Sequence, residues 1–171
     1  FGRMTLDSSA LAQLGPEPLS DEFTPSCFAT ALRRSSQAIK VKLLDQTVVA
    51  GVGNIYASEA LFRAGISPRL AARRLNEAQV RRLRRTVRAV LREAIRCGST
   101  IPLSFAQPAA DGLFYFGRTA GTPDFYEERL LVYDRAGKPC PRCRTPIKRI
   151  VQAARSTFFC PKCQNLALRL R

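Results

Sequence analysis

The chain has 171 residues, 46% of them apolar, and its 28 Lys and Arg against 13 Asp and Glu give a formal net charge of +15. This length fits one domain, or one domain with a small appendage, and the apolar content argues against wholesale disorder. No apolar run is long enough to cross a membrane, so we expect no membrane partner. The charge points first to nucleic acid and second to an anionic membrane surface, with a merely basic protein as the alternative.

The first part of the chain predicts a linker followed by a short helix. The segment LGPEPLS at 14–20 carries two prolines, each of which disfavours helical geometry at the preceding residue. Thr24 and Pro25 then have the typical composition of an N-cap and a first helical residue, and the helix is expected to run to about Arg34. Phe28 and Leu32 lie four residues apart and predict its buried face.

Two further helices are expected before residue 66. Residues 38–46 predict a short one with Ile39 and Leu43 inward. The next is expected to begin at Asn54, a good N-cap, and to stop at Gly65.

Residues 76–97 are the strongest helical pattern in the chain, with Asn76 as its cap. The opposite side from its apolar stripe carries arginines that we expect to form a solvated face: Arg81, Arg85, Arg88 and Arg92. Residues 98–126 are rich in glycine, proline and small residues and predict a long surface loop. From Tyr126 onward we expect two hairpins around the cysteine pairs.

Four of the six cysteines follow the pattern C-x2-C-x16-C-x2-C, and the chain has no histidine. Each C-x-x-C turn can present two thiolates to one metal ion, and two such turns complete a tetrahedral four-sulfur site. The expected ligands of one structural Zn²⁺ are Cys140, Cys143, Cys160 and Cys163. Two disulfides or a redox pair are the alternatives, while Cys27 and Cys97 stand alone.

The stretch VVAGVGNIYASE at 48–59 has no Lys or Arg, although the chain is so basic. Its glycines permit unusual backbone angles and a close approach of a ligand. The helix that follows offers free N–H groups and the positive end of a dipole, which together predict an anion site made by the backbone. A tight turn between two helices is the alternative.

Two longer segments resemble a known family. IKVKLLDQTVVAGVGNIYASEALFRAGISP at 39–68 is similar to the helix–two-turns–helix motif of formamidopyrimidine-DNA glycosylases, and YDRAGKPCPRC with TPIKRIVQAARSTFFCPKCQ is similar to their C-terminal zinc finger. FGRM and LGPEPLS resemble the end of their N-terminal domain and the linker after it. The resemblance implies a base-excision-repair enzyme that flips an oxidised purine out of duplex DNA, cuts its glycosidic bond and then nicks the backbone.

The resemblance assigns roles to particular residues. It implies DNA-phosphate contacts for Lys40, for Gly53 and Asn54 in the glycine turn, and for Arg155 near the tip of the second hairpin. A helix cap for Asn54 and solvated charge for Lys40 and Arg155 are the alternatives. The family's nucleophile is an N-terminal proline amine, which Phe1 does not match, so we expect no catalytic residue in this chain.

These observations predict a mainly α fold: a helix–two-turns–helix domain followed by a small β-hairpin zinc ribbon. We expect a remnant of an N-terminal domain with a linker at 1–19, the DNA-binding domain at 20–126 with the loop 98–126, and the four-cysteine zinc finger at 127–171. That loop is longer than is usual in the family. The expected partners are double-stranded DNA with an oxidised purine or abasic site and a missing N-terminal catalytic domain. The chain is expected to act as a cytoplasmic, nucleoid-associated monomer of bacterial type. The alternatives are a stand-alone, non-catalytic zinc-ribbon protein that binds nucleic acid and a ribosome- or RNA-associated one.

Overall fold

The computed structural model describes residues 13–96 and 130–165. The start of the predicted remnant (residues 1–12), the predicted loop 98–126 and Cys97 lie outside these residues. The described elements are, in chain order, α2 (Pro25–Arg33), α3 (Ile39–Leu43), α4 (Asn54–Ala64), the 3-10 helix η1 (Ala72–Arg74), α5 (Glu77–Arg96), β2 (Lys148–Gln152) and β3 (Arg155–Phe159). The mainly helical fold with one small hairpin is therefore confirmed, and none of the described helices is long and apolar enough to span a membrane.

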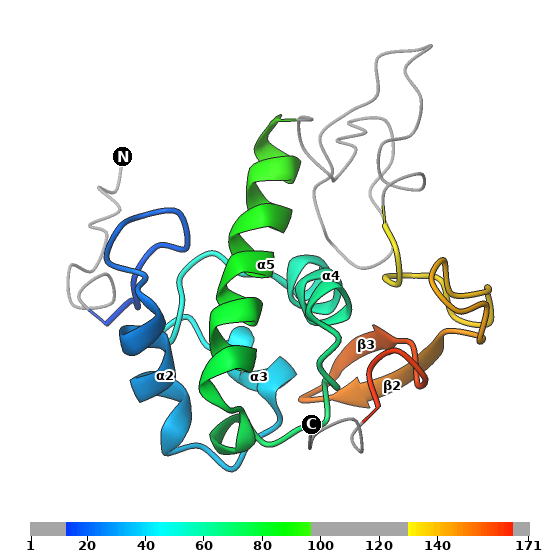
Figure 1. Ribbon diagram of the computed structural model, residues 1–171, viewed down its shortest axis with the longest axis horizontal. Coiled ribbons are helices and arrows are strands. Elements are labelled where there is room, and N and C mark those ends of the chain that lie inside the picture. Colours follow the sequence, from blue (N-terminus) through cyan, green and yellow to red (C-terminus); the bar gives the residue numbers. More distant parts are fainter. Residues whose placement is uncertain (1–12, 97–129, 166–171) are drawn as a thin grey trace, which may run out of the picture.

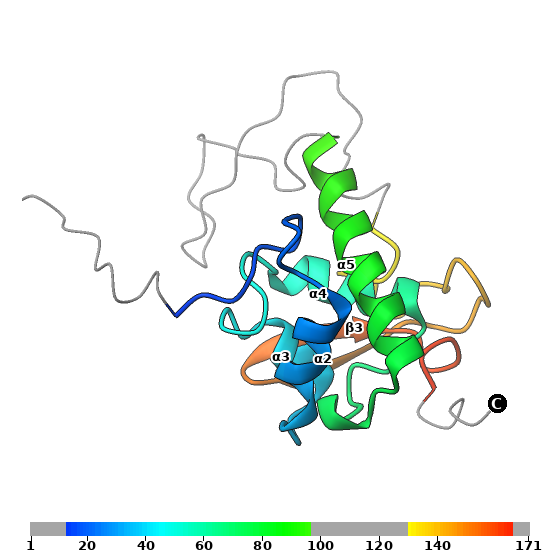
Figure 2. The ribbon, with the colours of Figure 1, turned by 60° about the vertical axis from the view of Figure 1, so that its left-hand side comes forward.

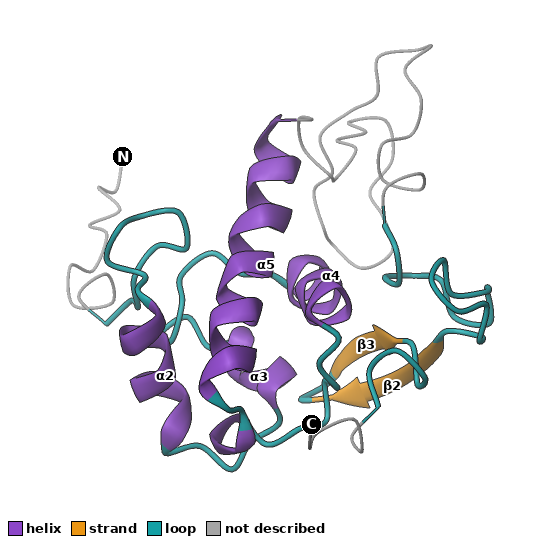
Figure 3. Ribbon diagram, in the orientation of Figure 1, coloured by secondary structure: helices purple, strands orange, loops and turns teal. Residues whose placement is uncertain are grey.

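The helices pack together around α5, and the hairpin lies at one side of them (Figures 1 and 3). Helix α4 lies between α5 and the hairpin in Figure 1, and it contacts both. Figure 2 shows α3 next to the hairpin as well. The strands β2 and β3 pair antiparallel, with Gln152 opposite Arg155 at the turn.

Local signals place the helix ends as the sequence indicates. The Thr24 hydroxyl accepts a hydrogen bond from the Cys27 N–H at 3.1 Å, and Pro25 is the first residue of α2. Asn76 and Gln79 cap α5 reciprocally, each side chain accepting the other residue's backbone N–H, at 2.8 and 2.9 Å. Gly65 ends α4 with φ 65°, a left-handed conformation that favours glycine.

Two expectations about helices are wrong in detail. Helix α3 ends at Leu43 instead of continuing to 46, because the Asp45 carboxylate accepts hydrogen bonds from the Thr47 N–H and hydroxyl and starts a turn there. Arg88 does not belong to a solvated face. Its guanidinium donates to the carbonyls of three consecutive residues in the linker: Pro18, Leu19 and Ser20, at 2.8–3.3 Å.

The two predicted hairpins are unequal. The second is the β2–β3 sheet, whereas the first is closed by a single antiparallel bridge between Pro139 and Pro146 and contains the first cysteine pair in its turn. The second cysteine pair lies in the turn after β3 rather than within a hairpin.

Two apolar cores share α4. The larger one lies among the helices and includes Ala57, Ala60 and Leu61 of α4, together with Leu83 and Val87 of α5. The smaller one belongs to the ribbon, and α4 contributes Phe62 to it, fully buried against buried ribbon residues: Val132, Ile147, Phe158 and two of the cysteines. Phe158 therefore packs in the ribbon. Helix α4 thus contributes residues to the core of the helices and to the core of the ribbon.

Candidate nucleic-acid interface and zinc site

Three of the predicted DNA-contacting residues come together although they lie far apart in the sequence. The Lys40 amine donates to the Asn54 side-chain oxygen at 2.5 Å and contacts the Thr157 hydroxyl at 3.4 Å. The Asn54 amide nitrogen donates to the Ser156 carbonyl at 3.0 Å. Because Arg155 is next to Ser156 and its charge acts on Lys40, helices α3 and α4 and strand β3 build one cationic cluster.

Lys40 is not a solvated charge, since its side chain is fully buried. Burial, followed by repulsion from Arg155, lowers the pKa of Lys40 to about 8. A buried ammonium whose charge is opposed by a neighbouring cation is unfavourable in the free protein. An anion at this position would relieve that cost.

Asn54 is the first residue of α4 and not its N-cap, so this expectation is wrong. Gly53 is the N-cap and has no side chain to offer. The Asn54 side chain points instead to the ribbon and to Lys40. A Cβ added at Gly53 would meet no atom within 4 Å, so the fold itself does not require glycine there. The space over the first turn of α4 is open to a ligand, and the helix dipole favours a negative one.

A surface hollow adjoins the cluster on the ribbon and reveals two polar residues that the sequence did not single out. Its volume is about 510 Å³, and its lining includes Tyr133, Arg149 and Ser156. The Tyr133 hydroxyl lies 3.4 Å from the Asn54 amide nitrogen, and Arg149 donates to the Ser156 hydroxyl at 3.0 Å. Arg149 and Arg155 are exposed cations on one hairpin.

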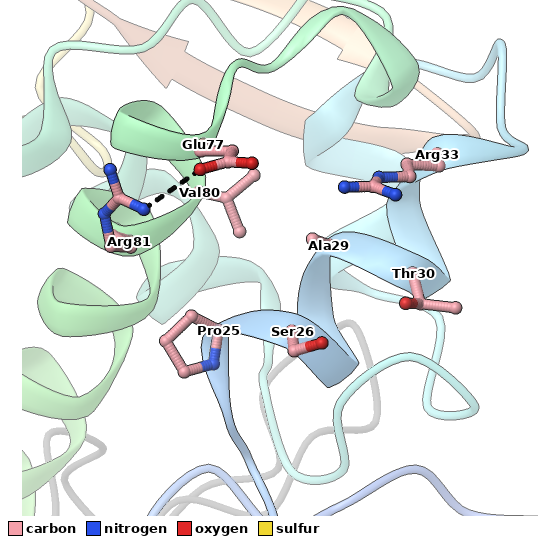
Figure 4. Close-up of a pocket in the computed structure, with 8 residues that line it drawn as sticks. All are labelled: Pro25, Ser26, Ala29, Thr30, Arg33, Glu77, Val80 and Arg81. Atoms are coloured by element: carbon pink, nitrogen blue, oxygen red, sulfur yellow. Dashed lines mark hydrogen bonds and ion pairs between the residues drawn. The ribbon is translucent and has the colours of Figure 1, made fainter.

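Another hollow, of about 280 Å³, lies between α2 and the start of α5 (Figure 4). Glu77 and Arg81 form an ion pair at its α5 side, and Arg33 points into it from α2. It shares no element with the Lys40 cluster, and none of the predicted site residues lines it.

Glu59, the single acidic residue of the glycine-rich stretch, holds the ribbon onto α4. Its carboxylate is 1% exposed and accepts the backbone N–H groups of Leu131, Val132 and Tyr133 at 2.9–3.1 Å. Three consecutive donors on one carboxylate satisfy a buried negative charge. Glu59 therefore fixes the segment that presents Tyr133 to Asn54.

The C-terminal end of α4 is docked to the ribbon as well. Arg142 donates to the carbonyls of Phe62 and Arg63 and stacks 4.5 Å from the centroid of the Phe62 ring. Gln164 accepts the Cys160 N–H and donates to the Ile66 carbonyl, both at 2.9 Å. The turn with the second cysteine pair is thus anchored to the end of this helix.

The four predicted metal ligands form one cluster. The sulfurs of Cys140, Cys143, Cys160 and Cys163 all lie within 4.8 Å of one another. Two of the separations are 3.4 and 3.8 Å. These values are close to the roughly 3.8 Å between sulfurs at tetrahedral corners about 2.3 Å from a zinc ion. Four cysteines with no other ligand type fit one closed, structural zinc site.

The surroundings of the sulfurs also fit a metal. Burial raises the pKa of Cys160 and of Cys163, while hydrogen bonding to Thr145 lowers the pKa of Cys143 to about 6. Four thiolates packed this closely would repel one another, and a bound cation removes that penalty. The zinc supplies no reaction step here; it holds the two turns together.

We expect about one zinc per chain in freshly purified protein, measured by elemental analysis. Cys143→Ser should lose most of it, because a structural site needs all four thiolates. Cys27→Ser is the matched control, since Cys27 is an exposed single cysteine outside the cluster. Far-UV circular dichroism of the zinc-free protein should keep most of the helical signal, because the helices have their own core. Full zinc content in Cys143→Ser would contradict the assignment.

We expect Glu59→Gln to lower the free energy of unfolding by roughly 2 kcal/mol or more, because an amide cannot accept all of the buried N–H groups that the carboxylate satisfies. Glu77→Gln is the control, since it removes an exposed carboxylate paired only with Arg81 among the described residues. It should change stability by at most about 1 kcal/mol. Urea titrations of both variants with zinc bound make the comparison. Equal stability of the two variants would show that the Glu59 contacts contribute little.

Comparison with known proteins agrees with this geometry. Residues 14–104 match the family "Formamidopyrimidine-DNA glycosylase H2TH domain", and residues 137–166 match "Zinc finger found in FPG and IleRS". The chain is 48% identical, over 97% of its length, to the formamidopyrimidine-DNA glycosylase of Chloroflexus aggregans. A crystal structure of the MutM (Fpg) protein of Thermus thermophilus is 46% identical over 91% of the chain, with a TM-score of 0.75.

A complex of Lactococcus lactis Fpg with DNA that contains an abasic site is 34% identical over 92% of the chain, also with a TM-score of 0.75. The chain spans only 58% of the C. aggregans protein, 55% of the T. thermophilus chain and 54% of the L. lactis chain. Since the first family match alone covers more than half of its residues, the chain belongs to the formamidopyrimidine-DNA glycosylase family.

Proposed function

We propose that this chain is the DNA-gripping part of a base-excision DNA glycosylase and AP lyase that acts on oxidised purines in duplex DNA. The observation that carries the proposal is the cluster of Lys40, Asn54 and Arg155 at the open N-terminus of α4. Three elements converge there on a cationic site that has no carboxylate partner among the described residues. Such a site suits a backbone phosphate.

Solved structures of related proteins support the choice of partner. Two L. lactis Fpg structures are complexes with DNA, one with an abasic site and one with the damaged base Fapy-dG. An enzyme that acts on such a base must take the nucleotide out of the stack, and it must hold the deformed backbone while doing so. In our proposal the present chain does this holding.

Each residue of the cluster has a distinct part in this proposal. Lys40 supplies a buried positive charge, and a phosphate would replace Asn54 as its strongest partner. The Asn54 amide and the first N–H groups of α4 donate to phosphate oxygens. Arg155 is exposed at the hairpin turn and binds the adjacent phosphate of the DNA backbone. Tyr133 and Arg149 extend the same surface along the ribbon.

The bond-breaking steps at the sugar take place elsewhere in the whole enzyme. We assign the nucleophilic amine to an N-terminal catalytic domain of the whole enzyme, as the family resemblance implies, and no bond-breaking role to the residues described here. The complete enzyme would work as a cytoplasmic, nucleoid-associated monomer. A stand-alone zinc-ribbon protein that binds nucleic acid without catalysis is the alternative, and an RNA-associated ribbon is the third possibility.

We expect this chain to bind duplex DNA with an abasic-site analogue more tightly than undamaged duplex or RNA. Asn54→Ala and Arg155→Ala should each weaken binding by roughly ten- to a hundredfold, since each removes a hydrogen bond to a charged phosphate. Arg155→Ala should also reduce the salt dependence of binding by about one phosphate contact. Fluorescence anisotropy at several salt concentrations measures both effects.

Arg85→Ala is the control for charge alone, because Arg85 is an exposed arginine on α5. If Asn54→Ala and Arg155→Ala bind like this control, the phosphate site is assigned to the wrong residues. A preference for RNA would favour the ribosome- or RNA-associated alternative.

DNA affinity is expected to fall as the pH rises through about 8, because the pKa of Lys40 lies there and only its charged form attracts phosphate. Binding should then take up close to one proton in this pH range. Lys40→Met should bind more weakly at neutral pH and show a flat pH profile over the same interval. An unchanged pH profile in Lys40→Met would show that another group titrates.

A further inference from the structure

The cluster around Lys40 stands at one end of a short pairing between the segment that leads into α3 and the segment that leads into η1. Residues 35–40 run antiparallel to residues 68–73, joined by four backbone hydrogen bonds of 2.7–3.3 Å and an isolated bridge between Ala38 and Ala71. At one end the Lys40 N–H donates to the Pro68 carbonyl, and at the other the Arg73 N–H donates to the Ser35 carbonyl. These hydrogen bonds hold the two segments side by side at one edge of the helical domain.

Four exposed arginines lie on or beside these two segments: Arg34, Arg69, Arg73 and Arg74. We call them the basic edge. Arg69 is at the Lys40 end, and the other three are gathered where η1 meets the end of α2. None of the four guanidinium groups forms an ion pair with a carboxylate in residues 13–96 or 130–165.

The basic edge is continuous with the proposed phosphate site. The Pro68 carbonyl accepts from the Lys40 N–H and, at 3.4 Å, from the Gln152 side chain, which pairs in register with Arg155. Pro68 thus connects Lys40 to the hairpin turn, and Arg69 is the next residue. The cations form a line from Arg155 past Arg69 to the three arginines near η1.

Some arginines of the helical domain have internal partners. Arg88 and Arg84 donate to carbonyls of the segment 18–23, and Arg63 pairs with Glu93. The arginines of the basic edge have no such side-chain bonds within the described part of the chain, and neither have Arg82, Arg85, Arg92 and Arg96 of α5. What distinguishes the edge is its place beside the Lys40 site, to which Pro68 and Gln152 connect it.

We propose that the basic edge binds the phosphate backbone of duplex DNA that flanks the nucleotide held at the Lys40–Asn54–Arg155 site. The inference rests on the proposed function and extends its footprint in one direction. From Lys40 to Ser35 the edge is at most about 16 Å long, at roughly 3.3 Å for each extended residue, because Ile39 and Lys40 already belong to α3. Phosphates of one DNA strand follow at about 3.4 Å along the helix axis, so the edge spans at most about five base pairs.

The test compares two variants of this chain that lose the same charge at different places. The edge variant changes Arg34, Arg69, Arg73 and Arg74 to Gln. The control variant changes four exposed arginines of α5 to Gln: Arg82, Arg85, Arg92 and Arg96. Both lose four positive charges, so any difference between them reports position. Zinc content and circular dichroism should match the wild type in both. The pairs Arg34/Arg69 and Arg73/Arg74 serve as smaller variants if the fourfold edge variant does not fold.

Binding is measured on an abasic-analogue duplex with long flanks and on two duplexes truncated close to the analogue on one side or the other. On the long duplex, the edge variant should lose about 2 to 4 units of the slope of log affinity against log salt, at roughly 0.9 per phosphate contact, while the control changes little. Truncation of one particular side should remove the difference between the edge variant and the wild type.

The inference would be overturned if the two variants lost the same amount of the salt slope, or if the edge variant lost the same amount on all three duplexes. An acidic protein would then be the better candidate partner for the basic edge. If the wild type itself binds all duplexes without salt dependence, the proposed function fails before the edge is tested.

Discussion

The carboxylate of Glu59 is the contact on which the rest of the structure depends. It is buried in the middle of α4 and satisfies three consecutive backbone N–H groups at the entry to the ribbon. A buried charge with full hydrogen bonding is costly to disturb, because every donor would be left without a partner. This contact places the start of the ribbon on the same helix whose N-terminus carries the proposed phosphate site. Arg142 and Gln164 secure the other end of α4.

The proposed phosphate site is therefore built at the interface between the helices and the ribbon rather than by either part alone. Lys40 and Asn54 come from the helices, while Thr157, Ser156 and Arg155 come from β3. The four-cysteine cluster lies at the far end of the same strand, so the zinc site keeps these groups in register without touching a ligand. A purely structural metal would in this way support the proposed DNA binding.

The large positive charge of the chain divides into cations with different roles. Arg84, Arg88 and Arg142 donate to backbone carbonyls and hold segments together. Lys40 is buried and the pKa of its amine is lowered, so a bound anion would stabilise its charged form. The arginines of the basic edge and of the hairpin remain exposed. Net charge alone pointed to nucleic acid but could not separate these groups.

Some features of this protein follow from the sequence alone, and others only from the packing. Helix caps such as Thr24 and Asn76 and the stop at Gly65 are local, and the cysteine spacing predicts a four-sulfur site by itself. The likeness to the family's motifs brought Lys40, Asn54 and Arg155 to attention. Sequence patterns could not predict their hydrogen bonds. Asn54 donates to the ribbon instead of capping its helix, and Lys40 is buried.

Only the tertiary structure decided the roles of Glu59, Arg88 and Tyr133. The groups that these three residues contact lie far away along the chain: 72 positions for Glu59 and Leu131, 70 for Arg88 and Pro18, and 79 for Tyr133 and Asn54. Periodicity and capping rules report on neighbours within a few residues, because they reflect the geometry of one helix turn or one strand. The pairing of distant donors and acceptors depends on how α4, α5 and the ribbon pack. That packing therefore determines the geometry of the candidate site.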